Sequence, residues 1–100
     1  MALRSYQQFI QLNTLYEVVQ ADTGSGSSLQ PYIEIVGGVG NVYGSAVLPG
    51  SPPTNMTNST PNGLQGIENF GVLPNYLYVT QASGTITSIV LSGVIAKAVS

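Results

Sequence analysis

The chain has 100 residues, of which 43% are hydrophobic and only 6% are charged, whereas soluble domains usually carry about 25% charged residues. Two basic residues, four acidic residues and no histidine or cysteine exclude three classes: a basic nucleic-acid-binding surface, disulfide or thiol chemistry, and zinc sites. The length predicts a single domain, and the hydrophobic content is sufficient for one modest core.

The charged residues are widely spaced, with none between Glu34 and Glu68 and none between Glu68 and Lys97. A free monomer usually relies on charged side chains for solubility and for protection of its sheet edges. This chain must therefore wet its surface with neutral polar side chains or cover much of it against neighbouring subunits. We favour a covered surface; the alternative is a neutral polar surface like that of some extracellular β-domains.

Two further patterns bear on location. The N-terminal residues lack the apolar stretch of a signal peptide, and Ser92 and Gly93 interrupt the short apolar run over 89–96. We therefore expect a soluble protein that is made without a cleaved leader. The shortage of basic residues argues against a nucleic-acid partner and against an anionic membrane surface as a partner.

The predicted elements begin with residues 1–12, where Leu3, Tyr6, Phe9 and Ile10 are spaced near a helical period. This pattern predicts a short helix or an extended arm, and so short a helix needs a surface to lie on. We therefore divide the chain into an N-terminal arm over 1–12 and a β domain over 13–100.

The β domain begins with a predicted strand at 14–20, followed by a loop at 21–28 that contains Gly and Ser. Over 31–36 the residues alternate, with Ile33 and Ile35 on one face. Three glycines and an asparagine over 37–41 suit a turn with positive φ, so 31–48 predicts a β-hairpin.

The stretch 49–66 is rich in Pro, Asn and Ser, which predicts a long irregular loop. Loops of this length in compact domains are usually functional or disordered. Further strands are predicted at 67–72, 75–80 and 85–99. The last of these is apolar on both faces, which predicts a central strand, with Gly93 marking a bulge or bend.

Six or seven short strands separated by turn signals predict an all-β fold. The expected architecture is a single small β-sandwich or jelly-roll-like barrel, with a short N-terminal arm or helix. The pattern does not distinguish the sandwich from the barrel.

Catalytic chemistry has few candidate residues in this sequence. Without histidine or cysteine, the commonest general base and the commonest nucleophile pairs are missing. The carboxylates Glu17, Asp22, Glu34 and Glu68 are dispersed, and a glycosidase pair requires folding to bring two together, for example Glu17 and Glu34 on neighbouring strands. We predict that the chain is not an enzyme, with no catalytic, metal or cofactor-binding residues and no cofactor.

The tyrosines are the most prominent remaining feature. Tyr76 and Tyr78 share one parity, opposite Leu77 and Val79, so they face outward if the aliphatic pair faces the core. Outward tyrosines are typical of interfaces and also stack on sugar rings. They equally suit a second buried face of the same protein. Tyr32 and Tyr43 are expected to lie near each other in the predicted hairpin.

The C-terminal stretch 77–91 has the sequence LYVTQASGTITSIVL and follows a polar loop. It resembles the closing hairpin of small β-sandwich virion proteins of tailed bacteriophages, in chains with few charges and no cysteine. The resemblance is one of composition and rhythm over part of the chain. It implies a location in the virion, after synthesis in the host cytoplasm. It also implies a partner, either a major capsid protein, further copies of the chain, or both, and it carries over no catalytic or ligand residue.

Two functional hypotheses follow. The first is a structural assembly protein of a virus particle, a capsid decoration or minor head or tail component that binds the major shell protein, itself, or both. The second is a carbohydrate- or surface-binding β module of a fibre or adhesin. The candidate interface residues are Leu3, Arg4, Tyr6, Phe9, Ile10, Tyr76 and Tyr78.

Overall fold

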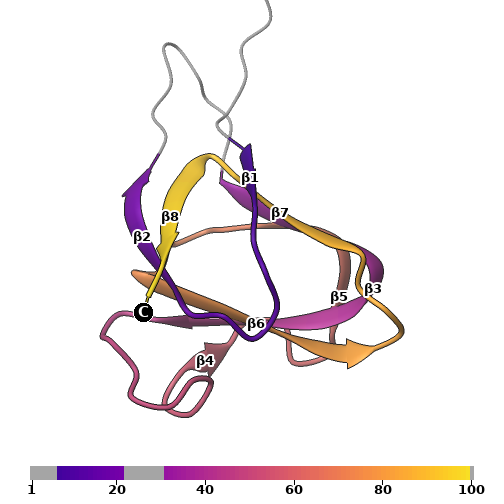
Figure 1. Ribbon diagram of the computed structural model, residues 1–100, viewed down its shortest axis with the longest axis horizontal. Coiled ribbons are helices and arrows are strands. Elements are labelled where there is room, and N and C mark those ends of the chain that lie inside the picture. Colours follow the sequence, from indigo (N-terminus) through magenta and orange to yellow (C-terminus); the bar gives the residue numbers. More distant parts are fainter. Residues whose placement is uncertain (1–6, 22–30, 100) are drawn as a thin grey trace, which may run out of the picture.

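The computed structural model describes residues 7–21 and 31–99, and in these ranges the chain forms eight β-strands and no helix. In chain order they are β1 (Gln7–Phe9), β2 (Tyr16–Ala21), β3 (Tyr32–Ser45), β4 (Thr57–Asn58), β5 (Leu64–Asn69), β6 (Tyr76–Ser83), β7 (Ser88–Ser92) and β8 (Val94–Ala98). All pair antiparallel in one sheet ordered β1-β7-β3-β6-β2-β8, with β4 and β5 also beside β3. The sheet curls into a nearly closed barrel, which confirms the predicted all-β class (Figure 1).

The long strand β3 organises this sheet. Its first half is flanked by β5 and β7, and its second half by β4 and β6. The predicted hairpin over 31–48 is therefore wrong, because the chain passes through 37–41 without reversing. Tyr32 and Tyr43 consequently lie at opposite ends of one strand.

Glycines explain why β3 bends here instead of turning back. Gly37 has a φ of +98°, and a Cβ at this position would lie 2.7 Å from the carbonyl oxygen of Thr85. A Cβ on Gly38 would lie 2.9 Å from the carbonyl oxygen of Ser83. The glycines thus allow the segment between β6 and β7 to approach β3 closely. They form a bulge in a continuous strand and do not form a turn.

The strands β6 and β7 pair with successive parts of β3. Tyr43 pairs with Tyr78 and Ile35 pairs with Ile89, so the partners of β3 follow each other in chain order. The stretch 77–91 is therefore not the hairpin that the resemblance implies. The chain changes course later, at Gly93 (φ +77°), which confirms the predicted bend there.

Beyond Gly93, β8 pairs with β2. Lys97 and Ala98 are exposed, so the prediction of one central strand covered on both faces does not hold for the end of 85–99. Polar and small residues at these positions could have indicated this exposure, but the aliphatic residues before them dominate the pattern.

The interior of the barrel is filled by aliphatic side chains from β3, β6 and β7. Ile33 and Ile35 share one face as predicted, and this face is the inner one. Leu77 and Val79 also face the core, which was the condition for outward tyrosines, and all four side chains are at most 1% exposed. Complete burial of each such side chain contributes roughly 1.5–3 kcal/mol to the stability of the folded state. The buried hydrophobic cluster consists of Ile10, Tyr16, Ile33, Ile35, Val42, Leu64, Leu77, Val79, Ile89, Leu91 and Val94.

The barrel is closed between β1 and β8 by the side chain of Gln8. Its Nε2 donates to the carbonyl oxygen of Ala96 at 3.0 Å, and the N–H of Ala96 donates to Oε1 of Gln8 at 3.0 Å. The amide thereby serves both backbone groups of Ala96, as a neighbouring strand would. The described part of the predicted N-terminal arm is thus a strand of the barrel.

Candidate interaction surface

The N-terminal candidates have different positions in the structure. Leu3, Arg4 and Tyr6 lie outside the described residues. Phe9, on β1, is 76% exposed, as a contact residue should be. Ile10 is 5% exposed and belongs to the core, so its selection as an interface residue is wrong. Successive residues of an extended chain point to opposite faces, which separates these two neighbours.

Tyr76 and Tyr78 lie on the outer face of β6, because Leu77 and Val79 between and after them point into the core. Both tyrosines are half-buried. Tyr43 on β3 is the register partner of Tyr78, and paired positions of antiparallel strands share a face. Three tyrosines therefore gather on this outer surface, and sequence reasoning missed Tyr43 because it assigned that residue to a hairpin.

Polar side chains flank the tyrosines in register. Glu17 on β2 pairs with Tyr76, and Lys97 on β8 pairs with Glu17. Ser45 is the partner of Tyr76 on the other side. This surface is the outside of a barrel and hence convex, whereas small-molecule sites are concave. Its shape suits contact with a protein surface better than enclosure of a ligand.

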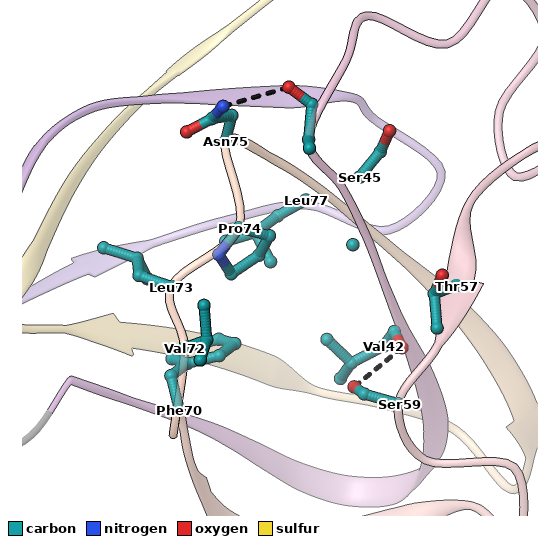
Figure 2. Close-up of a pocket in the computed structure, with 12 residues that line it drawn as sticks. Val42, Ser45, Thr57, Ser59, Phe70, Val72, Leu73, Pro74, Asn75 and Leu77 are labelled. Atoms are coloured by element: carbon teal, nitrogen blue, oxygen red, sulfur yellow. Dashed lines mark hydrogen bonds between the residues drawn. The ribbon is translucent and has the colours of Figure 1, made fainter.

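A pocket of about 450 Å³ opens beside the second half of β3 (Figure 2). The buried side chains of Val42 and Leu77 contribute to it from the core. An apolar wall comes from the segment between β5 and β6, and a hydroxyl-bearing wall comes from Thr57 and Ser59. The complete lining is Val42, Gly44, Ser45, Ala46, Thr57, Ser59, Phe70, Val72, Leu73, Pro74, Asn75 and Leu77.

The apolar wall is fastened to the end of β3 by Asn75. Its backbone N–H donates to the carbonyl oxygen of Ser45 at 3.1 Å, and its Nδ2 donates to that of Ala46 at 2.9 Å. A Cβ on Gly44 would lie 3.0 Å from the Cβ of Pro74, so the glycine makes room for the proline ring. These contacts hold the apolar wall against the end of β3.

The opposite wall is fastened by Thr60, which is 7% exposed. Its Oγ1 accepts the N–H of Val42 at 2.8 Å, and its carbonyl oxygen accepts Nδ2 of Asn41 at 2.6 Å. Ser59 adds backbone and side-chain hydrogen bonds to the carbonyl oxygen of Val42. The predicted irregular loop over 49–66 is thus tied to β3, and it contains β4 and the start of β5.

Exposed aliphatic side chains stand on the two segments that form the pocket mouth. Val72 is 89% exposed within the apolar wall, and Val47 and Leu48, 71% and 59% exposed, directly follow the lining residue Ala46. The lining includes no charged residue. Sequence reasoning missed this site, because single aliphatic residues in loops carry no signal of their own.

The positions of the acidic residues bear on catalytic and metal chemistry. Glu17 and Glu34 lie on β2 and β3, which are not paired with each other, so the carboxylate pair considered above does not form on neighbouring strands. Within 7–21 and 31–99, no group of three or more His, Cys, Asp or Glu residues is arranged to hold a metal ion. No helix among the described residues is long and apolar enough to span a membrane.

Comparison of the chain with protein-family models, with curated proteins and with solved structures finds no match.

Proposed function

We propose that this chain is a structural assembly protein of a virus particle, a capsid decoration or minor head or tail component that binds the major shell protein, itself, or both. One observation carries the proposal: large apolar side chains are exposed on several parts of a surface that has very few charges. These side chains are Phe9, Val19, Val36, Val47, Leu48, Ile67 and Val72.

An exposed apolar surface with few charges favours contact with other protein surfaces. Burial of apolar area contributes roughly 25 cal/mol per Å², and exposed apolar patches commonly mark contact sites. The pocket lining holds no charged side chain that would have to lose its hydration on contact. Several separate apolar regions allow one subunit to contact several neighbours, as repeated symmetric assemblies require.

The virion setting is supported by the sequence resemblance over 77–91. Since that stretch forms β6, β7 and the link between them rather than a hairpin, the support comes from composition and rhythm. In the same proposal the chain is a non-enzymatic component of the virion, with protein rather than nucleic acid or membrane as its partner.

The proposal is tested on virus particles banded from the source culture. Quantitative mass spectrometry should find peptides of this chain at a constant ratio to the major shell protein across the particle peak. A soluble host protein serves as the contamination control and should fall away from the peak. Absence of the chain from the banded particles would contradict the proposal.

A second function, a carbohydrate- or surface-binding module of a fibre or adhesin, is favoured by the cluster of Tyr43, Tyr76 and Tyr78. Tyrosine rings provide stacking faces for sugars, and the half-buried rings here lie together on one surface. A glycan array should then give a signal that Tyr78→Ala removes and Tyr32→Ala, outside the cluster, keeps. An array without signal at any glycan would rule out the carbohydrate form of this function.

A further inference from the structure

We infer that the pocket between β4 and the β5–β6 segment receives the exposed Phe9 of a second copy of this chain. This inference rests on the proposed function of an assembly subunit and names the residues through which copies join. The partner is identified by three properties: the exposure of the inserted side chain, the size of the pocket, and the lack of charged residues in both the pocket lining and the strand Gln7–Phe9.

Phe9 is suited to insertion because it is exposed and well held. It is the one exposed phenylalanine of the chain, since Phe70, the other, is half-buried in the pocket wall. The backbone of Phe9 is in register with Val90 of β7, and the preceding Gln8 is bonded to Ala96. An anchored strand presents its side chain with little loss of conformational entropy on binding.

The pocket is suited to an aromatic side chain. A cavity of about 150 Å³ is enough for a benzene ring, so the 450 Å³ here accommodates the ring of Phe9 together with neighbouring atoms. Phe70 and Pro74 offer apolar surfaces to the ring. Neither the lining nor the inserting strand Gln7–Phe9 contains a charged residue, so insertion of the ring places no charge in the pocket.

The inserting strand and the pocket lie on different parts of the molecule. None of the lining residues belongs to β1, and Figure 1 shows β1 in the upper part of the barrel and β4 in the lower part. Contact between copies therefore joins two different parts of the surface. A reciprocal contact gives a two-fold dimer, whereas a head-to-tail contact gives a ring when the rotation closes and an open filament when it does not. Exposed Val47, Leu48 and Val72 around the mouth extend the contact beyond the inserted ring.

The experiment separates the two halves of this contact. Phe9→Ser removes the inserted side chain, and Ala46→Trp fills the pocket from an exposed lining position. Val72→Asp, at the 89% exposed rim residue, is a second blocking variant in case the tryptophan disturbs folding. Ala82→Trp, at an exposed position on β6 outside the pocket, is the matched control.

Mass is measured by sedimentation velocity from about 10 µM to about 1 mM, the range of weak association. The wild-type chain and Ala82→Trp should rise above the 10.4 kDa of the monomer, and each of the other variants alone should remain at 10.4 kDa. A mixture of Phe9→Ser and Ala46→Trp should form a one-to-one dimer and nothing larger. Each dimer uses the one intact Phe9 and the one intact pocket.

Association of Phe9→Ser at the wild-type level, or a mixture that stays monomeric, would overturn the inference. A wild-type chain that stays monomeric at every concentration would overturn it as well. None of these results decides the proposed function, because attachment to a different shell protein is measured separately on the banded particles.

Discussion

Two sides of the barrel are held together in different ways. Along β3, β6 and β7 a long backbone ladder is backed by side chains such as Leu77 and Leu91, which are completely buried. Between β1 and β8 the connection runs through the side-chain amide of Gln8. The strand on this second side also carries the exposed Phe9. The ladder side therefore supplies stability, whereas the Gln8 side holds the exposed Phe9 in position.

The largest expected effect is on the ladder side. Leu91→Ala should lower the free energy of unfolding by about 2–5 kcal/mol, because the side chain is 0% exposed and its loss leaves a cavity. Urea denaturation followed by tyrosine fluorescence measures this. Val19→Ala, at a side chain that is 57% exposed, is the control and should cost far less. Equal losses for the two variants would contradict the described core.

The glycine bulge is the next point at which the ladder side can be broken. Gly37→Ala should lower the free energy of unfolding by about 1–3 kcal/mol, since φ is +98° and the new Cβ would lie 2.7 Å from the Thr85 oxygen. Gly71→Ala, where no atom lies within 4 Å of the new Cβ, is the control and should be nearly neutral. A neutral Gly37→Ala would mean that β3 does not approach the β6–β7 link so closely.

On the other side of the barrel, Gln8→Ala removes both hydrogen bonds to Ala96. The expected loss in free energy of unfolding is about 1–3 kcal/mol, because the backbone of Ala96 is left without its partners. Hydrogen exchange should accelerate at the Ala96 amide more than at amides of β3. The control Gln65→Ala changes an exposed glutamine of β5. Unchanged exchange at Ala96 would show that Gln8 does not close the barrel.

The smallest stability effect is expected for Phe9→Ser. The side chain is largely exposed, so the free energy of unfolding should change by no more than about 0.5 kcal/mol. Thermal unfolding at low protein concentration measures this. A large loss would place Phe9 in the fold rather than on a contact surface, and it would also weaken the interpretation of the association experiment.

Local alternation was enough to predict part of this fold. Ile33 with Ile35 and Leu77 with Val79 face the core as their spacing indicates, because the period of a strand fixes which side chains share a face. The bend at Gly93 was also readable. These features depend on residues close together in sequence.

The strand pairing could not be read in the same way. The glycines from 37 to 40 have the composition of a turn, and their role as a bulge depends on the distant segment that packs against them. Gln8 and Thr60 look like ordinary polar residues until Ala96 and Val42 are placed opposite them. Likewise Ile10 shares a helix-like spacing with Phe9, but the strand sends the two side chains to opposite faces.

The central claim about the isolated protein is that copies of the chain associate through apolar surfaces, and its most direct test is the mass of the wild-type chain by light scattering in low and high salt. The account predicts particles heavier than 10.4 kDa whose mass persists as salt rises from about 0.05 to 0.5 M, because screening acts on charges and not on apolar contacts. A species that stays at 10.4 kDa at every protein concentration, or an assembly that dissociates as salt is added, would contradict it.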